Sequence, residues 1–117
     1  MKPTDTDRLR HMRDAAVAAL TFIQGKDRTA LDSDQMLAFA LVRAVEIVGE
    51  AASQLSEAIR DAHPEIPWTK IIGMRNRLIH GYFDVDLDVL WATVATNLSP
   101  LIATLETMID AQSGQNG

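Results

Sequence analysis

The sequence predicts an all-α fold, an antiparallel bundle of four or five helices. Apolar residues recur at intervals of three and four along several segments, which is the period of a helix with one buried face. No segment shows the alternation typical of a strand, and the breaks between helical segments fall at Gly or Pro. With 117 residues, we expect a single domain over 1–117, with its core over about 5–110 and a frayed polar tail over 112–117.

The first helix is expected over 4–24. Thr4 or Asp5 can cap its N-terminus, and Asp7 lies in the first turn, where the helix dipole favours an acid. Gly25 is a natural end. One apolar stripe follows the helical period: Leu9, Met12, Ala16, Leu20 and Ile23.

A long second helix is expected after a connector over 26–31, with Asp32 and Ser33 as caps and an end near Ala62. Apolar residues cover much of its girth, so it must be covered on more than one side. In so short a chain, we expect a second copy of the protein to supply the second cover. Its core stripe is Leu37, Leu41, Val45, Val48, Ala52, Leu55 and Ile59, and its polar line is Arg43, Glu46, Glu50 and Glu57.

Two further helices complete the predicted bundle. Pro67 suits the first turn of a third helix that runs to about His80. The acidic turn over 84–88 can cap a fourth helix, which Pro100 should kink or divide. The apolar stripe of the fourth helix is Leu87, Leu90, Val94, Leu98, Leu101, Leu105 and Met108.

The composition is typical of a globular protein, with 47% hydrophobic and 23% charged residues. No apolar run approaches the roughly 20 residues of a membrane-spanning helix, and the polar N-terminus has no signal-peptide segment, so we expect a cytoplasmic protein. Cysteine is absent, which excludes disulfides and thiolate metal sites. The net charge of −5 argues against a general nucleic-acid coat protein but allows a local contact with RNA.

One stretch of the chain concentrates cationic and reactive side chains. Residues 66–83 contain three basic residues and no acid, whereas 84–117 contain five acids and no Lys or Arg. Within the cationic stretch, four residues separate Arg75 from His80, and one separates His80 from Tyr82. We therefore take this motif as the candidate functional site.

An Arg and a His so close in sequence suit the cleavage of an RNA phosphodiester. A neutral His80 imidazole can take the proton of a 2′-hydroxyl nucleophile. The Arg75 guanidinium can bind the phosphate oxygens and stabilise the charge of the transition state. Asn76, one helical turn before His80, can orient the imidazole or the phosphate, and Glu50 can support Arg75 if the second and third helices are adjacent. No metal is required, and the three His residues have no metal-ligand spacing.

A purely structural role is the alternative on spacing alone. Arg75 and His80 can pair with Glu46, with Glu50 or with the carbonyls at a helix end. Positions five apart on a helix are offset by about 140°, so Arg75 and His80 do not share a stripe. Two copies facing each other would nevertheless bring both sets of side chains into one groove.

Several segments around the motif occur in an order typical of one family. They are VGEAA at 48–52, PEIPW at 64–68, IGMRNRLIHGY at 72–82, VD at 85–86 and LW at 90–91. This succession resembles the HepT family, toxins of the HEPN superfamily found in bacteria and archaea. The resemblance covers about residues 5–110.

The resemblance implies an all-helical HEPN fold, a homodimer, and a metal-independent endoribonuclease that needs no cofactor. The family's catalytic Arg and His map onto Arg75 and His80, with Asn76 at the polar position after the Arg. The family's antitoxin is a minimal nucleotidyltransferase, MntA, and the resemblance implies that it transfers AMP from ATP to Tyr82. AMP on that phenol would place anionic phosphates in the RNA site and block it.

We therefore expect a ribonuclease toxin of a type VII-like toxin–antitoxin module. A rival hypothesis is a non-catalytic HEPN module that binds nucleotide or RNA as the accessory subunit of a minimal nucleotidyltransferase. A structural helical dimer is a third. Toxicity of the chain expressed alone separates the first hypothesis from the other two.

Overall fold

The computed structural model describes residues 4–79 and 84–116, with side chains described through 112. These residues form an all-α fold, which confirms the predicted fold class. An isolated antiparallel bridge joins Ile79 to Val85. The elements are, in chain order, α1 Asp5–Phe22, α2 Ala30–Ser33, α3 Gln35–Ser53, α4 Glu57–Ala62, α5 Trp68–Ile72, α6 Met74–Leu78, α7 Leu87–Ala92, the π-helix η1 Thr93–Asn97, and α8 Leu98–Asn116.

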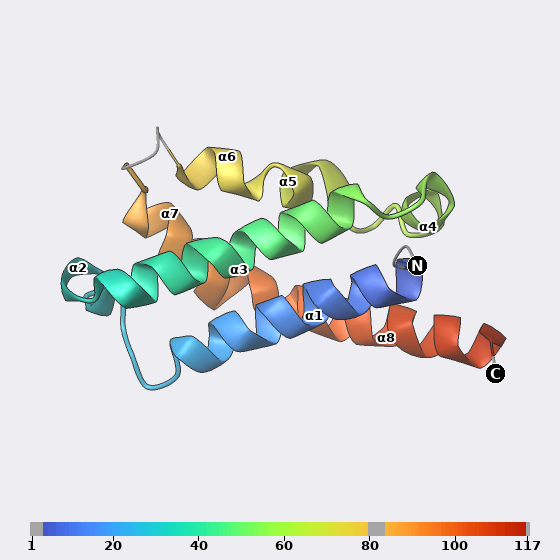
Figure 1. Cartoon of the computed structure of the whole chain (residues 1–117), viewed down its shortest axis with the longest axis horizontal. Helices are drawn as coiled ribbons and strands as arrows, with labels where there is room; N and C mark the ends of the chain where they lie inside the picture. Colours follow the sequence, from blue (N-terminus) through green and yellow to red (C-terminus); the bar gives the residue numbers. More distant parts are fainter. Residues whose placement is uncertain (1–3, 80–83, 117) are drawn as a thin grey trace.

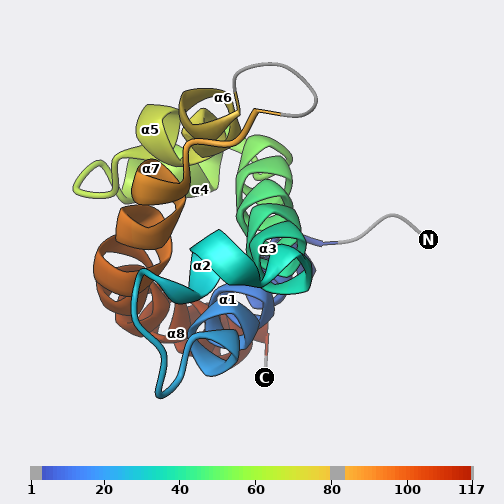
Figure 2. The same ribbon diagram turned by 90° about the vertical axis from the view of Figure 1, so that its left-hand side faces the viewer.

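Three long helices form the body of the bundle (Figure 1). Helix α1 packs against both α3 and α8, and α5 and α6 lie along α3 on the side away from α1. Helix α6 also packs against α7. Figure 2 shows α3 on one side of α6 and α7 on the other. The short α5–α6 pair therefore bridges the two sides of the bundle.

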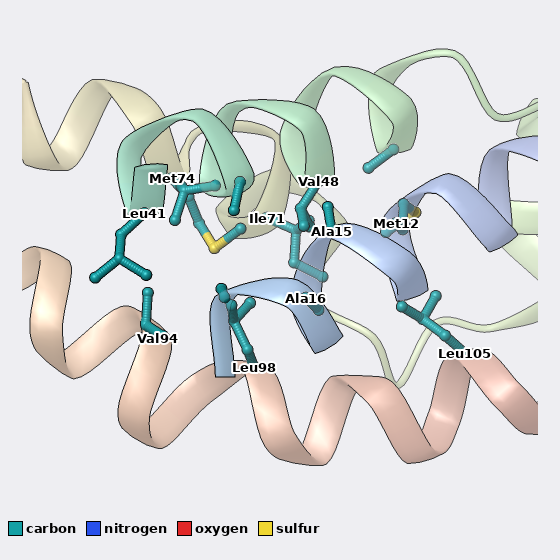
Figure 3. Packing of buried hydrophobic residues seen from close by; sticks show 14 of the residues in the cluster. Met12, Ala15, Ala16, Leu41, Val48, Ile71, Met74, Val94, Leu98 and Leu105 are labelled. Atoms are coloured by element: carbon teal, nitrogen blue, oxygen red, sulfur yellow. The ribbon is translucent and has the colours of Figure 1, made fainter. Parts of the chain in front are cut away.

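The hydrophobic core lies where α1, α3 and α8 face one another (Figure 3). Its members include the buried side chains Leu9, Met12, Leu41, Val48, Leu98 and Leu105. Met74 and Leu78 of α6 belong to the same cluster. Burial of a side chain of this size contributes about 1.5–3 kcal/mol. Helix α6 is therefore anchored by its apolar side, and its polar side is left on the surface.

Helix α1 begins as its sequence predicts. Thr4 and Asp7 form a capping box, in which the Asp7 amide donates to the Thr4 hydroxyl at 3.1 Å and the Thr4 amide donates to the Asp7 carboxylate at 2.9 Å. These hydrogen bonds from Thr4 lower the pKa of Asp7 below its ordinary value. Gly25 has a φ of 75° in the turn that follows the helix, a conformation that glycine adopts without strain.

The predicted second helix is divided into three helices. The end of the predicted connector and the predicted caps Asp32 and Ser33 together form the short α2. The cap of α3 is instead Asp34, whose carboxylate accepts from the Leu37 amide at 3.0 Å. The last residues of the predicted second helix form α4, which Ser56 caps through the Ile59 amide at 3.3 Å.

The break between α3 and α4 is held by the start of α1. The Arg8 guanidinium donates to the Gln54 carbonyl at 2.8 Å, and the Asp5 carboxylate accepts from the Ser56 hydroxyl at 2.7 Å. Both contacts join residues distant in sequence, which is why the local helical period over 32–62 does not predict the break.

The predicted third helix is divided at Gly73 into α5 and α6. Gly49 of α3 allows α5 to approach closely, because a Cβ there would lie 3.2 Å from the Ile71 carbonyl oxygen and 3.3 Å from that of Ile72. Trp68 ties the start of α5 to the end of α4, since its indole N–H lies 3.1 Å from the carbonyl oxygens of both Arg60 and His63. The end of α5 is therefore fixed on α3 by close backbone packing, and the start of α5 is fixed on the end of α4 by Trp68.

The predicted fourth helix is interrupted just before Pro100, as expected, and the interruption is the π-helix η1. Pro100 has no N–H to donate to the carbonyl of Thr96, four residues earlier, so the regular α-helical bond is lost at that point. The Thr93 hydroxyl donates to the Val89 carbonyl at 2.7 Å across the start of η1. Helix α8 then continues to Asn116, into the tail for which fraying is predicted.

Part of the surface of α3 is apolar. Met36 is 82% exposed and Phe39 is 62% exposed, on the same side of the helix as Arg43, Glu46 and Glu50.

No helix in the described part of the chain combines the length and the apolar character needed to cross a membrane.

Candidate functional site

The guanidinium of Arg75 lies on the side of α6 that faces α3. Its Nε donates to Oε2 of Glu46 at 3.1 Å. The Arg75 side chain is 51% exposed and that of Glu46 is 23% exposed, so Glu46 is the more buried of the two partners. Because the contact uses Nε, and the described residues give the two terminal nitrogens no hydrogen-bond partner, these nitrogens can bind an anion in a bidentate manner.

Glu50 does not occupy the supporting position expected for it. It lies 3.6 Å from Arg43, and both side chains are more than half exposed. Glu46, one turn earlier on α3, supports Arg75 instead, because the division of the third helix at Gly73 places α6 beside the earlier part of α3. Asn76 lies on the exposed surface of α6.

Two predicted site residues, His80 and Tyr82, lie outside the described residues. Helix α6 ends at Leu78, and Ile79 is extended with φ −111° and ψ 119°, so the predicted helix does not reach His80. The spacing argument that stacks Asn76 below His80 on one helix is therefore wrong. The helix ends before Ile79 because Ile79 pairs with Val85 in the bridge, and a β-branched residue favours this extended conformation.

The described ends of this segment are held together beside α6. Besides the Ile79–Val85 bridge, the Asp86 amide donates to the Leu78 carbonyl at 2.6 Å. These two contacts lie at the C-terminus of α6, about one turn of helix from Arg75, and they join the two ends of the segment that contains His80 and Tyr82.

The opposite side of α6 lines a hollow of about 480 Å³. We call it the α6–α8 hollow: α5 and α6 form one wall, and η1 and the start of α8 form the other. Lys70 and Arg77 line it, and an Nη of Arg77 donates to the Lys70 carbonyl at 3.3 Å. In the sequence, these two cations lie in the same acid-free stretch as Arg75, but no sequence pattern places them at this hollow.

The described residues contain no group of three or more His, Asp or Glu side chains placed to hold a metal ion.

Comparison with known proteins agrees with the resemblance to the HepT family. The model of the HepT-like ribonuclease family matches residues 12–108. A protein of Thermococcus cleftensis, named probable ribonuclease HepT, is 43% identical over 75 residues, which cover 64% of this chain and 68% of that protein. A protein of Methanocaldococcus jannaschii, named as a candidate RNase, is 31% identical over 93 residues, which cover 80% of this chain and 85% of that protein.

No solved structure matches the chain significantly. The family model nevertheless runs from the middle of α1 to the middle of α8, and this range includes every helix that carries a candidate site residue. The protein therefore belongs to the HepT-like ribonuclease family.

Proposed function

We propose that the protein is a metal-independent endoribonuclease toxin that cleaves RNA with Arg75 and His80. The observation that carries this proposal is the state of Arg75. Its guanidinium is half exposed and oriented by Glu46, and no other described residue bonds to its terminal nitrogens, which can therefore bind a phosphate. Membership of the HepT-like ribonuclease family supports RNA as the substrate.

The proposed reaction is a transfer within the RNA chain. His80 takes the proton of a 2′-hydroxyl, whose oxygen forms a bond to the adjacent phosphorus while the bond from phosphorus to the 5′-oxygen breaks. The leaving 5′-oxygen takes up a proton from solvent water, His80 returns its proton to solvent, and the products are a 2′,3′-cyclic phosphate and a 5′-hydroxyl. Arg75 stabilises the charge on the phosphate oxygens during this exchange.

The exposed apolar residues of α3 support the proposed homodimer. Met36 and Phe39 continue the surface line that contains Glu46, at helical intervals of three, four and three residues through Arg43. A second copy covering this line would bury both apolar side chains and would lie beside the Glu46–Arg75 pair. The proposed active site would then include both copies.

The proposed partner is a minimal nucleotidyltransferase of the MntA type that neutralises the toxin. In this proposal it transfers AMP from ATP to the Tyr82 hydroxyl and releases pyrophosphate. The added phosphate then blocks RNA binding sterically and by charge repulsion.

The test is RNA cleavage in EDTA by the purified chain, after mass spectrometry has established that Tyr82 is unmodified. We expect the wild type to cleave, and Arg75→Ala and His80→Ala each to lose at least about 100-fold in rate. Arg10→Ala, an exposed Arg of α1, is the matched control and should cleave as the wild type does.

Two other results would contradict the proposal. Equal cleavage by the wild type and both site variants would exclude this site. No cleavage and no growth inhibition by the unmodified wild type would favour the accessory subunit of a nucleotidyltransferase.

A further inference from the structure

We infer that the α6–α8 hollow is a second RNA-binding subsite, which holds one nucleotide of the substrate strand beyond the cleaved phosphate. This inference rests on the proposed ribonuclease function. It assigns a binding role to Lys70, Arg77 and the surface that η1 and α8 present to them.

The charge balance of the hollow favours an anion. Within the described part of the chain, no carboxylate lies within 4.0 Å of a side-chain nitrogen of Lys70 or Arg77, whereas Arg75 has Glu46. The acid that lines the hollow, Glu65, lies 3.3 Å from the His63 ring. Two exposed cations without an acidic partner, in a chain of net charge −5, form a local site for phosphate.

The shape and lining of the hollow favour a nucleotide over a bare phosphate ion. Its volume of about 480 Å³ is that of a small-ligand site. Ile66, Ile71, Met74 and Leu98 provide a buried apolar floor beneath the two cations. An apolar floor beside cations matches a nucleotide, in which a flat base is joined to a charged phosphate.

The far wall offers polar groups that can contact a base or a ribose. Thr96 and Asn97 belong to η1, and Thr104 follows on α8. Asn97 has an amide that both donates and accepts, which suits the edge of a base. The π-helix places exposed Thr96 and Asn97 next to buried Leu98 at this wall, and π segments often occur at functional sites.

Arg77 is held in place before any ligand arrives. One Nη donates to the Lys70 carbonyl, which is among the carbonyls left free where α5 ends at Gly73. The rest of the guanidinium remains available to a phosphate, and a side chain already ordered loses less entropy on binding.

The position of the hollow suits a strand that also reaches Arg75. Arg75 and Arg77 are two residues apart, so they point about 200° apart around α6 and lie only about 3 Å apart along its axis. A single strand that crosses the end of α6 can therefore place one phosphate on each side of this helix.

The first experiment measures the binding of a labelled single-stranded oligoribonucleotide of about 12 nucleotides. It uses the His80→Ala protein in EDTA, so the RNA stays intact. We expect the double substitution Lys70→Gln with Arg77→Gln to raise Kd about tenfold. It should also reduce the slope of log Kd against log salt by about 1.4, because each lost contact with a single strand removes about 0.7. Lys26→Gln, in the exposed turn after α1, should leave Kd unchanged.

A second pair of variants tests the hollow without removing a cation. Thr104→Glu puts a negative charge into the hollow, whereas Ala103→Glu puts the same charge on the exposed neighbouring position of α8. We expect Thr104→Glu to weaken binding about fivefold or more and Ala103→Glu to change it less than about twofold. Circular dichroism checks that all variants are folded.

Three results would overturn the inference. One is a Kd for the Lys70/Arg77 double variant equal to that of Lys26→Gln. Another is equal weakening by Thr104→Glu and Ala103→Glu. The third is that free UMP or AMP binds as tightly as the oligoribonucleotide, which would assign the hollow to a free nucleotide. Because binding is measured in a cleavage-deficient variant, these failures are distinct from a wild type that does not cut RNA.

Discussion

The cationic side chains on the two sides of the α5–α6 pair differ in whether they have a carboxylate partner. On the side facing α3, Arg75 is paired with Glu46 at 3.1 Å, and Gly49 brings the α3 backbone close to the end of α5. On the side facing η1 and α8, Lys70 and Arg77 line an open hollow and have no carboxylate partner among the described residues.

This difference separates a positioning task from a binding task. A paired guanidinium loses rotational freedom and keeps one geometry, which suits stabilisation of a transition state. Unpaired cations in a hollow keep their full charge for binding an anion. They can increase the affinity for RNA and fix the position of the strand without being placed exactly. One short helix can therefore serve both tasks, because residues two apart point in nearly opposite directions.

The largest expected difference between the two sides is their response to Arg→Lys substitution. Arg75→Lys removes the planar fork that reaches Glu46 and a phosphate together, so we expect kcat for RNA cleavage to fall about 100-fold, or about 2.7 kcal/mol. Arg77→Lys keeps the charge in the hollow, so we expect a rise in KM of about threefold and little change in kcat. Single-turnover cleavage at several RNA concentrations separates the two effects, and equal losses would remove the distinction between the sides.

Glu46 gives a smaller and more selective effect. Glu46→Ala releases Arg75, and we expect kcat to fall about tenfold. The free energy of unfolding should change by less than about 1 kcal/mol, because the pair is partly exposed. Glu46→Gln keeps an oxygen for the Arg75 Nε and should stay within about threefold of the wild type. If Glu46→Gln were as impaired as Glu46→Ala, orientation through this hydrogen bond would be the wrong explanation.

The smallest expected effect concerns packing on the α3 side. Gly49→Ala adds a methyl 3.2 and 3.3 Å from two backbone carbonyl oxygens, which are unable to rotate away as a side chain would. Overpacking of this kind costs about 1–3 kcal/mol, and the better helix propensity of Ala recovers about 1 kcal/mol. We therefore expect a net loss of about 1 kcal/mol in urea unfolding. Ala103→Gly, at an exposed position of α8, is the reference for the propensity term alone, and a stabilised Gly49→Ala would show that α5 has room to move.

The sequence predicts the fold class and the start of α1 because both depend on local signals. The apolar stripe of α1 and its Thr4–Asp7 capping box depend only on residues close together in the sequence. The break between α3 and α4 is held by Arg8 and Asp5, about fifty residues away, and no local pattern records these contacts.

For the candidate site, sequence analysis identifies the cation but not its support. Arg75 stands out by its place in an acid-free stretch. Glu46 and Glu50 share a helix face, so either could support it by period alone, and the choice of Glu46 follows from how α6 packs on α3. The hollow was not predictable for a similar reason, since its two walls come from residues 65–77 and 96–104.

The bridge between Ile79 and Val85 has a consequence for mutation and inheritance. It joins the two described ends of the segment that contains His80 and Tyr82, and the core of the described residues lies in the rest of the chain. The proposed base His80 therefore lies outside the described core, and we expect His80→Ala to abolish activity while the helices that carry this core stay folded. For the proposed toxin, one such substitution would remove toxicity and leave a folded chain.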